Sequence, residues 1–87
     1  GDAMEPTIRS GDLLLVDQSE SIIKGDGIYL IRIEDGMMVK RVQWLLGGSS
    51  AILCGDNSAV SKEQTLSSAQ MEKLHILGRV VWVGSKL

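Results

Sequence analysis

The sequence predicts one small all-β domain with at most one short helical turn. Short apolar segments dense in Val and Ile recur along the chain, and such β-branched residues favour strands. Clusters of Gly, Asp, Asn and Ser separate these segments, as turn residues do. The chain has 87 residues, which is the size of one small hydrophobic core.

The N-terminal part predicts a loop followed by a short strand. We expect the loop over residues 1–12, because Pro6 and the run Ser10-Gly11-Asp12 favour turns. The apolar residues 13–17 predict the first strand. Residues 18–26 are largely polar and predict the connection to the next strand.

The strongest local signal is a β-hairpin between residues 28–34 and 37–46. Asp35-Gly36 lies between the two segments, and glycine tolerates the positive φ of a type I′ turn. This turn would place Ile31 directly opposite Lys40. A slip of one residue in this pairing would exchange the two faces of the hairpin.

The remainder of the chain predicts three more strands and the helical turn. Runs of glycine and polar residues at 47–49 and 55–63 separate them. Ser67 or Ser68 would cap the helical turn, because a serine hydroxyl accepts a hydrogen bond from a free backbone N–H. The predicted strands cover residues 50–54, 64–66 and 74–84, and the predicted helical turn covers residues 67–73.

Lys40 is anomalous within the predicted hairpin. Directly opposed residues share a sheet face, so Lys40 would lie on an apolar face with Tyr29, Ile31 and Val42. Such a lysine is either a functional amine or a side chain that extends its ammonium group to solvent along an apolar surface. The pattern alone leaves both interpretations open.

Residues 1–17 resemble the opening of the C-terminal domain of LexA-type and phage CI-type repressors. The resemblance continues through Lys40-Arg41, Gly55-Asp56-Asn57 and residues 78–82. It implies that residues 1–87 form one small, strongly twisted and coiled β-sheet domain of the LexA and signal peptidase type.

In that family a serine nucleophile and a lysine base cut the protein's own chain. Ala3 occupies the position of the serine, directly before Met4-Glu5-Pro6, and Lys40 matches the lysine. A serine hydroxyl attacks only after a base takes its proton, and a lysine is a base only in its neutral form, which burial favours. Because alanine has no hydroxyl, we expect this chain to be inactive. The sequence leaves open whether Ala3 is engineered or natural.

The resemblance also implies a cleft around these two positions. We expect Lys40 to lie largely buried beside Ala3. Met4, Ile31 and Met38 are the residues that we expect to line the cleft.

By resemblance, the chain is the dimerisation and autoproteolysis domain of a phage or SOS transcriptional repressor. The intact protein would add an N-terminal helix-turn-helix domain that binds operator DNA. It would also have a linker with an Ala-Gly or Cys-Gly cleavage bond. Both are expected outside this chain, and an activated RecA filament would trigger the cut.

Two other classes stay open, a type I signal peptidase and a UmuD-like polymerase accessory protein. Signal peptidases carry the same serine and lysine pair. They continue, however, with an Arg and a Ser-Asp-Ser-Arg type stretch where this chain has Ser58-Ala59-Val60-Ser61. A helix-turn-helix pattern upstream of Gly1 would favour the repressor, and a long apolar helix would favour the peptidase.

The last predicted strand carries the expected homodimer contact. Simple alternation places Val80 and Trp82 on one face and Val81 and Val83 on the other. Both faces are apolar, so one would meet the core and the other a second copy. An apolar edge strand also tends to pair with another chain.

Composition excludes several function classes for this segment. The net charge is −2 with no basic run, which argues against direct DNA binding. No apolar stretch reaches the roughly 20 residues that span a membrane, and no signal peptide is present, so we expect a cytoplasmic bacterial protein. Cys54 and His75 are the only residues of their types, so we expect no disulfide, no metal site and no cofactor.

Overall fold

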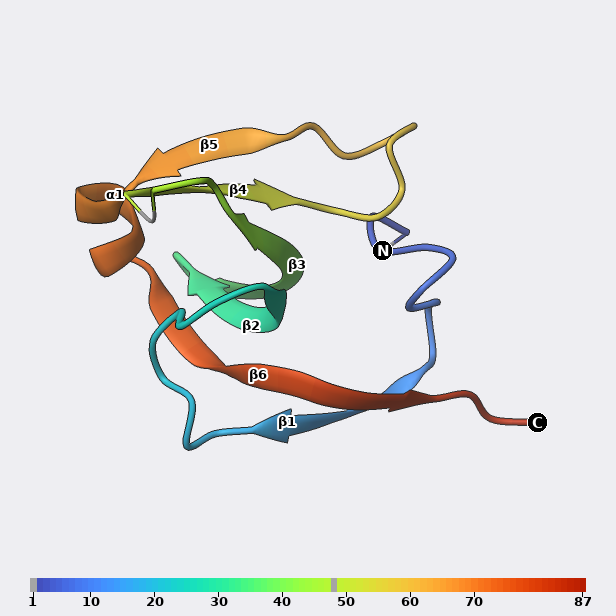
Figure 1. The fold of residues 1–87 in the computed structure, drawn as a ribbon. Coiled ribbons are helices and arrows are strands. Elements are labelled where there is room, and N and C mark those ends of the chain that lie inside the picture. Colours follow the sequence, from blue (N-terminus) through green and yellow to red (C-terminus); the bar gives the residue numbers. More distant parts are fainter. Residues whose placement is uncertain (1, 48) are drawn as a thin grey trace.

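The computed structural model describes residues 2–47 and 49–87 as one antiparallel sheet with a short helix. The elements are β1 (Leu13–Asp17), β2 (Gly27–Ile33), β3 (Gly36–Trp44), β4 (Ser50–Cys54), β5 (Gln64–Ser67), α1 (Ser68–Glu72) and β6 (His75–Gly84). The six strands follow the order β1-β6-β2-β3-β4-β5, which confirms the all-β prediction. Strand β1 and residues 79–84 of β6 form a two-stranded part of the sheet, the β1–β6 ribbon. Figure 1 shows β4 and β5 at one end of the curled sheet and the β1–β6 ribbon at the other.

The helix α1 begins at a serine cap, as the sequence predicted. The Ser67 hydroxyl accepts a hydrogen bond from the Gln70 N–H at 3.2 Å, and the Gln70 side chain accepts one from the Ser67 N–H at 2.9 Å. This reciprocal pair satisfies two backbone donors at the helix start. Met71 is buried in the core, so the helix packs against the sheet beside β4 and β5.

Within the described residues, no helix has the length and apolar character needed to cross a membrane.

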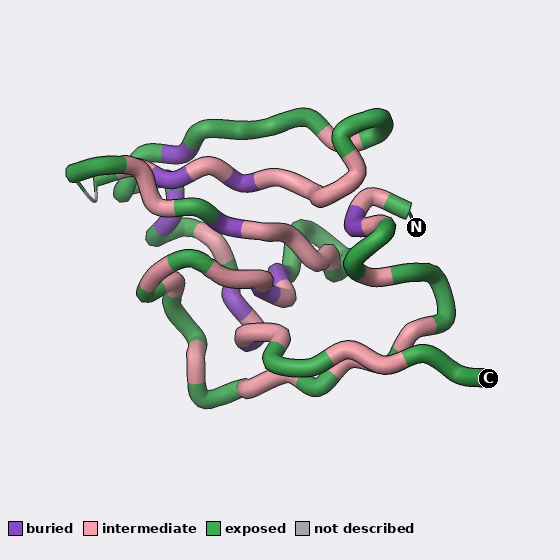
Figure 2. The backbone as a smooth tube through the Cα atoms, turned by 45° about the vertical axis from the view of Figure 1, so that its right-hand side comes forward, coloured by how far each residue is buried: buried purple, intermediate pink, exposed green. Residues whose placement is uncertain are grey.

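The hydrophobic core draws on α1 and on every strand except β1. Figure 2 shows the buried segments in the curl of the sheet, whereas the β1–β6 ribbon is half-buried or exposed. The Tyr29 hydroxyl donates to the Gly25 carbonyl at 3.0 Å, which satisfies its polar group inside the core. The core residues are Tyr29, Ile31, Val42, Ala51, Leu53, Leu66, Met71 and Ile76.

The β2–β3 hairpin has a different turn from the predicted one. Ile33 pairs with Gly36, so the turn residues are Glu34 and Asp35, and Glu34 takes a positive φ of 53°. Glycine at position 36 is used as a strand residue instead. The predicted pairing is therefore wrong by two positions. The local preference of Asp-Gly for a turn is outweighed by the further ladders that β2 forms with β6 and β3 with β4.

The face assignment of Lys40 survives this error. Lys40 lies opposite Tyr29, and Ile31 lies opposite Met38. A shift of two positions leaves every side chain on the same face, because side chains alternate with a period of two. Lys40 thus shares the core face of the hairpin with Tyr29 and Val42.

The strand β6 is interrupted by two bulges. Leu30 pairs with Gly78 and Ile31 with Ile76, and Leu15 pairs with Trp82 and Val16 with Val80. At each bulge, β6 therefore has one residue more than the strand opposite it. Such an extra residue bends the strand and increases its twist. The bend carries β6 away from β2 and toward β1.

Because of the second bulge, the side chains of β6 do not alternate between the two faces as the sequence predicted. Val80 lies opposite Val16 and Val83 opposite Leu14, so Val80 and Val83 share one face. Trp82 lies opposite Leu15 and therefore on the other face. Nor is β6 an edge strand, because it lies between β1 and β2.

Candidate active site

A cavity of about 330 Å³ brings Ala3 and Lys40 together. The N-terminal loop contributes Ala3, Met4 and Ile8, and β3 contributes residues 37–40. Ala3 and Lys40 are both half-buried, whereas the sequence predicted a largely buried lysine. The amine of Lys40 is thus the only charged group among the lining residues, in a wall that is otherwise apolar.

Two of the three predicted cleft residues line this cavity. Met4 is 5% exposed and Met38 is half-buried, and both are lining residues. Ile31 does not line the cavity, because it is fully buried in the core behind its partner Met38. The shifted hairpin register explains this error, since the prediction placed Ile31 opposite Lys40.

Sequence reasoning missed Ile8, Met37 and Val39 as lining residues. The last two lie on the opposite face of β3 from Met38 and Lys40. Four consecutive residues can line one cavity only along the edge of their strand. The β4 ladder covers β3 at residues 41–44 and leaves this edge beside 37–40 without a described strand partner. The signal available in the sequence was the greater length of the third predicted strand compared with the fourth.

Backbone hydrogen bonds shape the N-terminal loop at the cavity wall. The Ile8 N–H donates to the Met4 carbonyl at 3.0 Å, and the Asp12 N–H donates to the Arg9 carbonyl at 3.0 Å. The Asp12 carboxylate in turn accepts from the Arg9 N–H at 2.8 Å. The Arg9 N–H, followed by the Ser85 hydroxyl, lowers the pKa of Asp12. The turn predicted at residues 10–12 is therefore confirmed.

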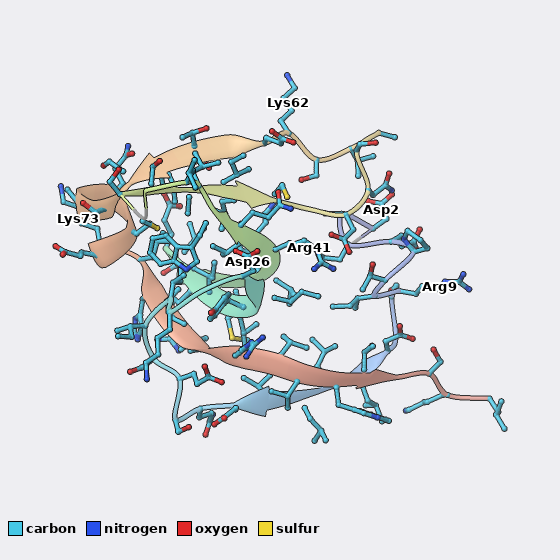
Figure 3. All side chains as sticks on the ribbon, viewed as in Figure 1. Asp2, Arg9, Asp26, Arg41, Lys62 and Lys73 are labelled. Atoms are coloured by element: carbon cyan, nitrogen blue, oxygen red, sulfur yellow. The ribbon has the colours of Figure 1, made fainter. Side chains whose placement is uncertain are left out.

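A charged network lies beside the cavity. Arg41, which follows Lys40 in β3, donates from Nε to Asp56 Oδ1 at 2.6 Å and from Nη2 to Asp56 Oδ2 at 2.9 Å. The Thr7 hydroxyl also donates to Asp56 Oδ2. Figure 3 shows the Arg41 side chain directed toward the N-terminal loop that carries Asp2. The hydrogen bond from Arg41 lowers the pKa of Asp56, against an opposing effect of burial, so Asp56 is charged at neutral pH.

Cys54 does not replace the missing hydroxyl. Burial raises the pKa of its thiol, and the charges of Glu63 and Asp56 act in the same direction. The thiolate is the nucleophilic form of cysteine, so the raised pKa keeps this thiol mostly in its less reactive protonated form at neutral pH. Across residues 2–47 and 49–87, no three His, Cys, Asp or Glu side chains gather to hold a metal ion.

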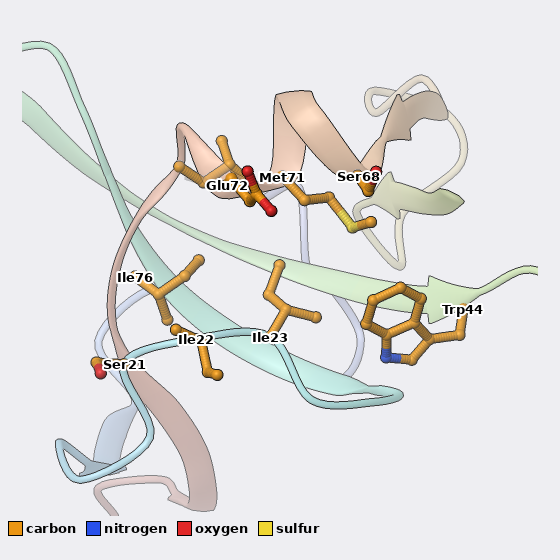
Figure 4. A pocket seen from close by; sticks show the side chains of 9 residues that line it. Ser21, Ile22, Ile23, Trp44, Ser68, Met71, Glu72 and Ile76 are labelled. Carbon is orange, nitrogen blue, oxygen red and sulfur yellow. The ribbon is translucent and has the colours of Figure 1, made fainter. Parts of the chain in front are cut away.

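A second cavity of about 400 Å³ lies elsewhere and shares no lining residue with the first. Figure 4 shows it between α1 and the connection from β1 to β2. Its only charged lining residue is Glu72, and in the described part of the chain the buried Trp44 indole N–H has no hydrogen-bond partner. An apolar cavity with a single carboxylate offers no pair of groups for acid–base chemistry. The lining residues are Ser21, Ile22, Ile23, Trp44, Ser68, Met71, Glu72, Leu74 and Ile76.

Residues 1–81 match the sequence pattern of the peptidase S24-like family. The chain belongs to this family. An uncharacterized HTH-type transcriptional regulator of Haemophilus influenzae is 37% identical to the S24-like chain over 87 residues, which are 100% of this chain and 36% of the relative. A 26 kDa repressor protein of Escherichia phage HK022 is 38% identical over 81 residues, which are 93% of this chain and 33% of the relative. The S24-like chain thus spans about a third of the length of these curated relatives.

Membership of the S24-like family confirms the resemblance drawn from residues 1–17 and from the later motifs. Ala3 and Lys40, which both line the cavity, end in a methyl group and an amine. A methyl group has no lone pair and no exchangeable proton, so residue 3 supplies no nucleophile.

Proposed function

We propose that this chain is the C-terminal regulatory domain of a bacterial or phage transcriptional repressor. Its cavity would be a serine–lysine self-cleavage site that Ala3 disables. The observation that carries the proposal is the shared cavity of Ala3 and Lys40 in a chain of the S24-like family. The names of the two relatives, a transcriptional regulator and a phage repressor, support the regulatory role.

The chemistry requires a hydroxyl at residue 3. A serine oxygen there would attack a peptide carbonyl carbon while its proton passes to the neutral amine of Lys40. The C–N bond would then break, and the departing amine would take that proton. Water would afterwards hydrolyse the ester on the serine. Alanine supplies neither the oxygen nor the proton, so the first bond cannot form.

The open edge of β3 suggests how a substrate would lie. Residues 37–40 line the cavity along an edge that the described strands leave uncovered. An extended peptide could add to this edge as a further strand, with main-chain hydrogen bonds fixing its register. The scissile carbonyl would then lie between residue 3 and Lys40. The linker of the intact repressor is the segment that we propose for this position.

The whole protein would have further parts and partners. We propose an N-terminal helix-turn-helix domain that binds operator DNA, and the name of the Haemophilus influenzae relative supports this. A RecA filament would promote the cut, and the protein would act in the bacterial cytoplasm. The relatives' names favour this reading over a signal peptidase, as does the sequence Ser58-Ala59-Val60-Ser61.

We also propose a homodimer through the β1–β6 ribbon. On one face, Leu13, Leu15 and Trp82 are 56%, 58% and 54% exposed, and Val81 at the bulge is 57% exposed. Val80 and Val83 lie on the other face and are half-buried. The contact would therefore be the exposed face of a two-stranded ribbon, with Trp82 at its centre.

Restoring the hydroxyl tests the proposed activity. The Ala3→Ser variant should cleave an added peptide of about ten residues with a central Ala-Gly bond, a length that spans the cavity in extended form. The rate should rise toward alkaline pH, because a lysine amine accepts a proton only in its neutral form. Mass spectrometry of the products gives the rate and the bond. Comparable cleavage by the parent chain with Ala3 would show that residue 3 is not the nucleophile position.

A further inference from the structure

The contacts around the loop 55–57 connect the two halves of the proposed site. Lys40 belongs to β3 and Ala3 to the N-terminal loop, and these segments are not joined by a described strand ladder. Asp56 bridges them. Both oxygens of its carboxylate accept hydrogen bonds from Arg41, next to Lys40, and Oδ2 also accepts one from the Thr7 hydroxyl.

The neighbouring residues hold the backbone of residue 3 itself. The Asn57 N–H donates to the Ala3 carbonyl at 2.9 Å, and the Asn57 side-chain amide donates to the Asp2 carbonyl at 3.1 Å. Gly55 makes this approach possible, because a Cβ at that position would lie 2.4 Å from the Ala3 carbonyl oxygen. The loop therefore contacts residue 3 directly, through its backbone.

We propose that Asp56 is a positioning residue that sets the separation between residue 3 and Lys40. This inference rests on the proposed serine–lysine function. The two-point contact of Arg41 fixes the orientation of the carboxylate relative to β3, since paired N–H donors constrain angle as well as distance. Thr7 and Asn57 then fix the N-terminal loop relative to the same short segment. Asp56 does not line the cavity, so it would act only through its neighbours.

Loss of this bridge should affect the rate more than the fold. A displacement of about 1 Å between reacting groups can lower a rate by about 100-fold. The hydrophobic core contains none of these residues, so the sheet should persist without the bridge. Asp56→Asn keeps the size of the side chain and removes its charge, which makes it the cleanest change.

The first experiment compares peptide cleavage in the Ala3→Ser background. We expect Asp56→Asn to lower kcat by about tenfold or more with little change in KM, at pH values where both variants are fully folded. Asp17→Asn is the matched control, since among the described contacts the Asp17 carboxylate accepts hydrogen bonds only from nearby Ser19. A rate for Asp56→Asn within about twofold of this control would overturn the proposal.

A double-mutant cycle separates positioning from general loss of stability. Arg41→Gln removes the paired hydrogen bonds between β3 and Asp56, and Thr7→Val removes the hydrogen bond between the N-terminal loop and Asp56. If both act through one carboxylate, the second change should add little to the first, whereas independent effects would add. Additive losses of rate would contradict a single bridge. Arg41→Lys should restore only part of the rate, because lysine lacks the paired donors.

Amide hydrogen exchange provides a readout without activity. In the chain with Ala3, Asp56→Asn should speed exchange of the Asn57 amide by about tenfold or more beyond any change at the β6 amides, which report global unfolding. Unchanged protection at Asn57 would refute the positioning role whether or not the Ala3→Ser chain cleaves. Failure of the Ala3→Ser chain to cleave, with faster exchange at Asn57, would refute the proposed activity and leave the anchoring of residue 3 supported.

Discussion

Asp56 illustrates how one carboxylate can link pH to stability. Hydrogen bonds from Arg41 lower its pKa in the folded state, and hydrogen bonds also lower the pKa values of Asp12 and Asp17. The unfolded chain has ordinary aspartate values of about 3.9 and therefore binds protons first as the pH falls. The stabilisation is present above that value and is lost as the pH falls through the lower folded pKa values.

Asp56→Asn should therefore be less stable than the parent at neutral pH. We expect a loss of about 1–2 kcal/mol in the free energy of unfolding, because the charged hydrogen bonds are made by a partly exposed pair. The difference should shrink as the pH falls below about 4, because the unfolded parent chain then binds a proton at Asp56 that the folded parent, with its lowered pKa, does not bind. Urea unfolding at pH 7 and pH 3 measures the difference in the free energy of unfolding between the two proteins at each pH. An equal difference at both pH values would contradict this role of Asp56.

Ala3, Met4, Met38 and Lys40 line one cavity, and their roles there stay a prediction. The sequence places Asp56 in a polar loop and does not predict its contacts, because its partners Arg41 and Thr7 are remote in sequence. Such a bridge depends on how two loops meet in space, which local patterns do not encode.

At the scale of elements, the β2–β3 hairpin shows what local signals can and cannot determine. The two strands and their faces follow from alternation, and Lys40 lies on the predicted face. The turn does not follow from Asp35-Gly36, because β2 also pairs with β6 and β3 with β4, and these further ladders constrain the register of the hairpin. The sequence did not predict the bulges in β6 for a similar reason, because they arise where β6 pairs with two different strands.

The turn of this hairpin carries a correctable strain. Glu34 has a φ of 53°, a conformation that costs a residue with a Cβ about 1 kcal/mol. Glu34→Gly should raise the free energy of unfolding by up to about 1 kcal/mol, although the flexibility of glycine in the unfolded chain offsets part of this gain. Asp35→Gly is the matched control, because Asp35 is not at positive φ. Urea denaturation should show the control to be less stable than the parent, and a loss of stability in Glu34→Gly would contradict the strain.

At the scale of the whole molecule, the β1–β6 ribbon lies outside the core. No β1 residue belongs to the core, and β1 pairs only with β6 in the described sheet. The ribbon nevertheless exposes large apolar side chains from both of its strands. A small domain gains stability by covering such a surface, and two-fold pairing is the commonest way to do so.

Placing a charge on the ribbon tests the proposed dimer. Sedimentation equilibrium at micromolar concentration should show a dimer for the parent and a monomer for Leu15→Lys. Leu46→Lys should remain a dimer, because Leu46 is fully exposed at the β3–β4 turn and away from the ribbon. A monomeric parent, or a Leu15→Lys variant that dimerises as the parent does, would show that this face is not the contact.

In the proposed site, a serine at residue 3 would be the nucleophile and Lys40 its base. A comparison of Ala3→Ser with the double variant Ala3→Ser, Lys40→Met tests this pairing, using the Ala-Gly peptide and product mass spectrometry. Methionine keeps an unbranched side chain in the cavity wall and removes only the amine. We predict cleavage by the single variant and none above background by the double variant, at any pH at which both are folded. Equal cleavage by the two variants would contradict the pairing of residue 3 with Lys40.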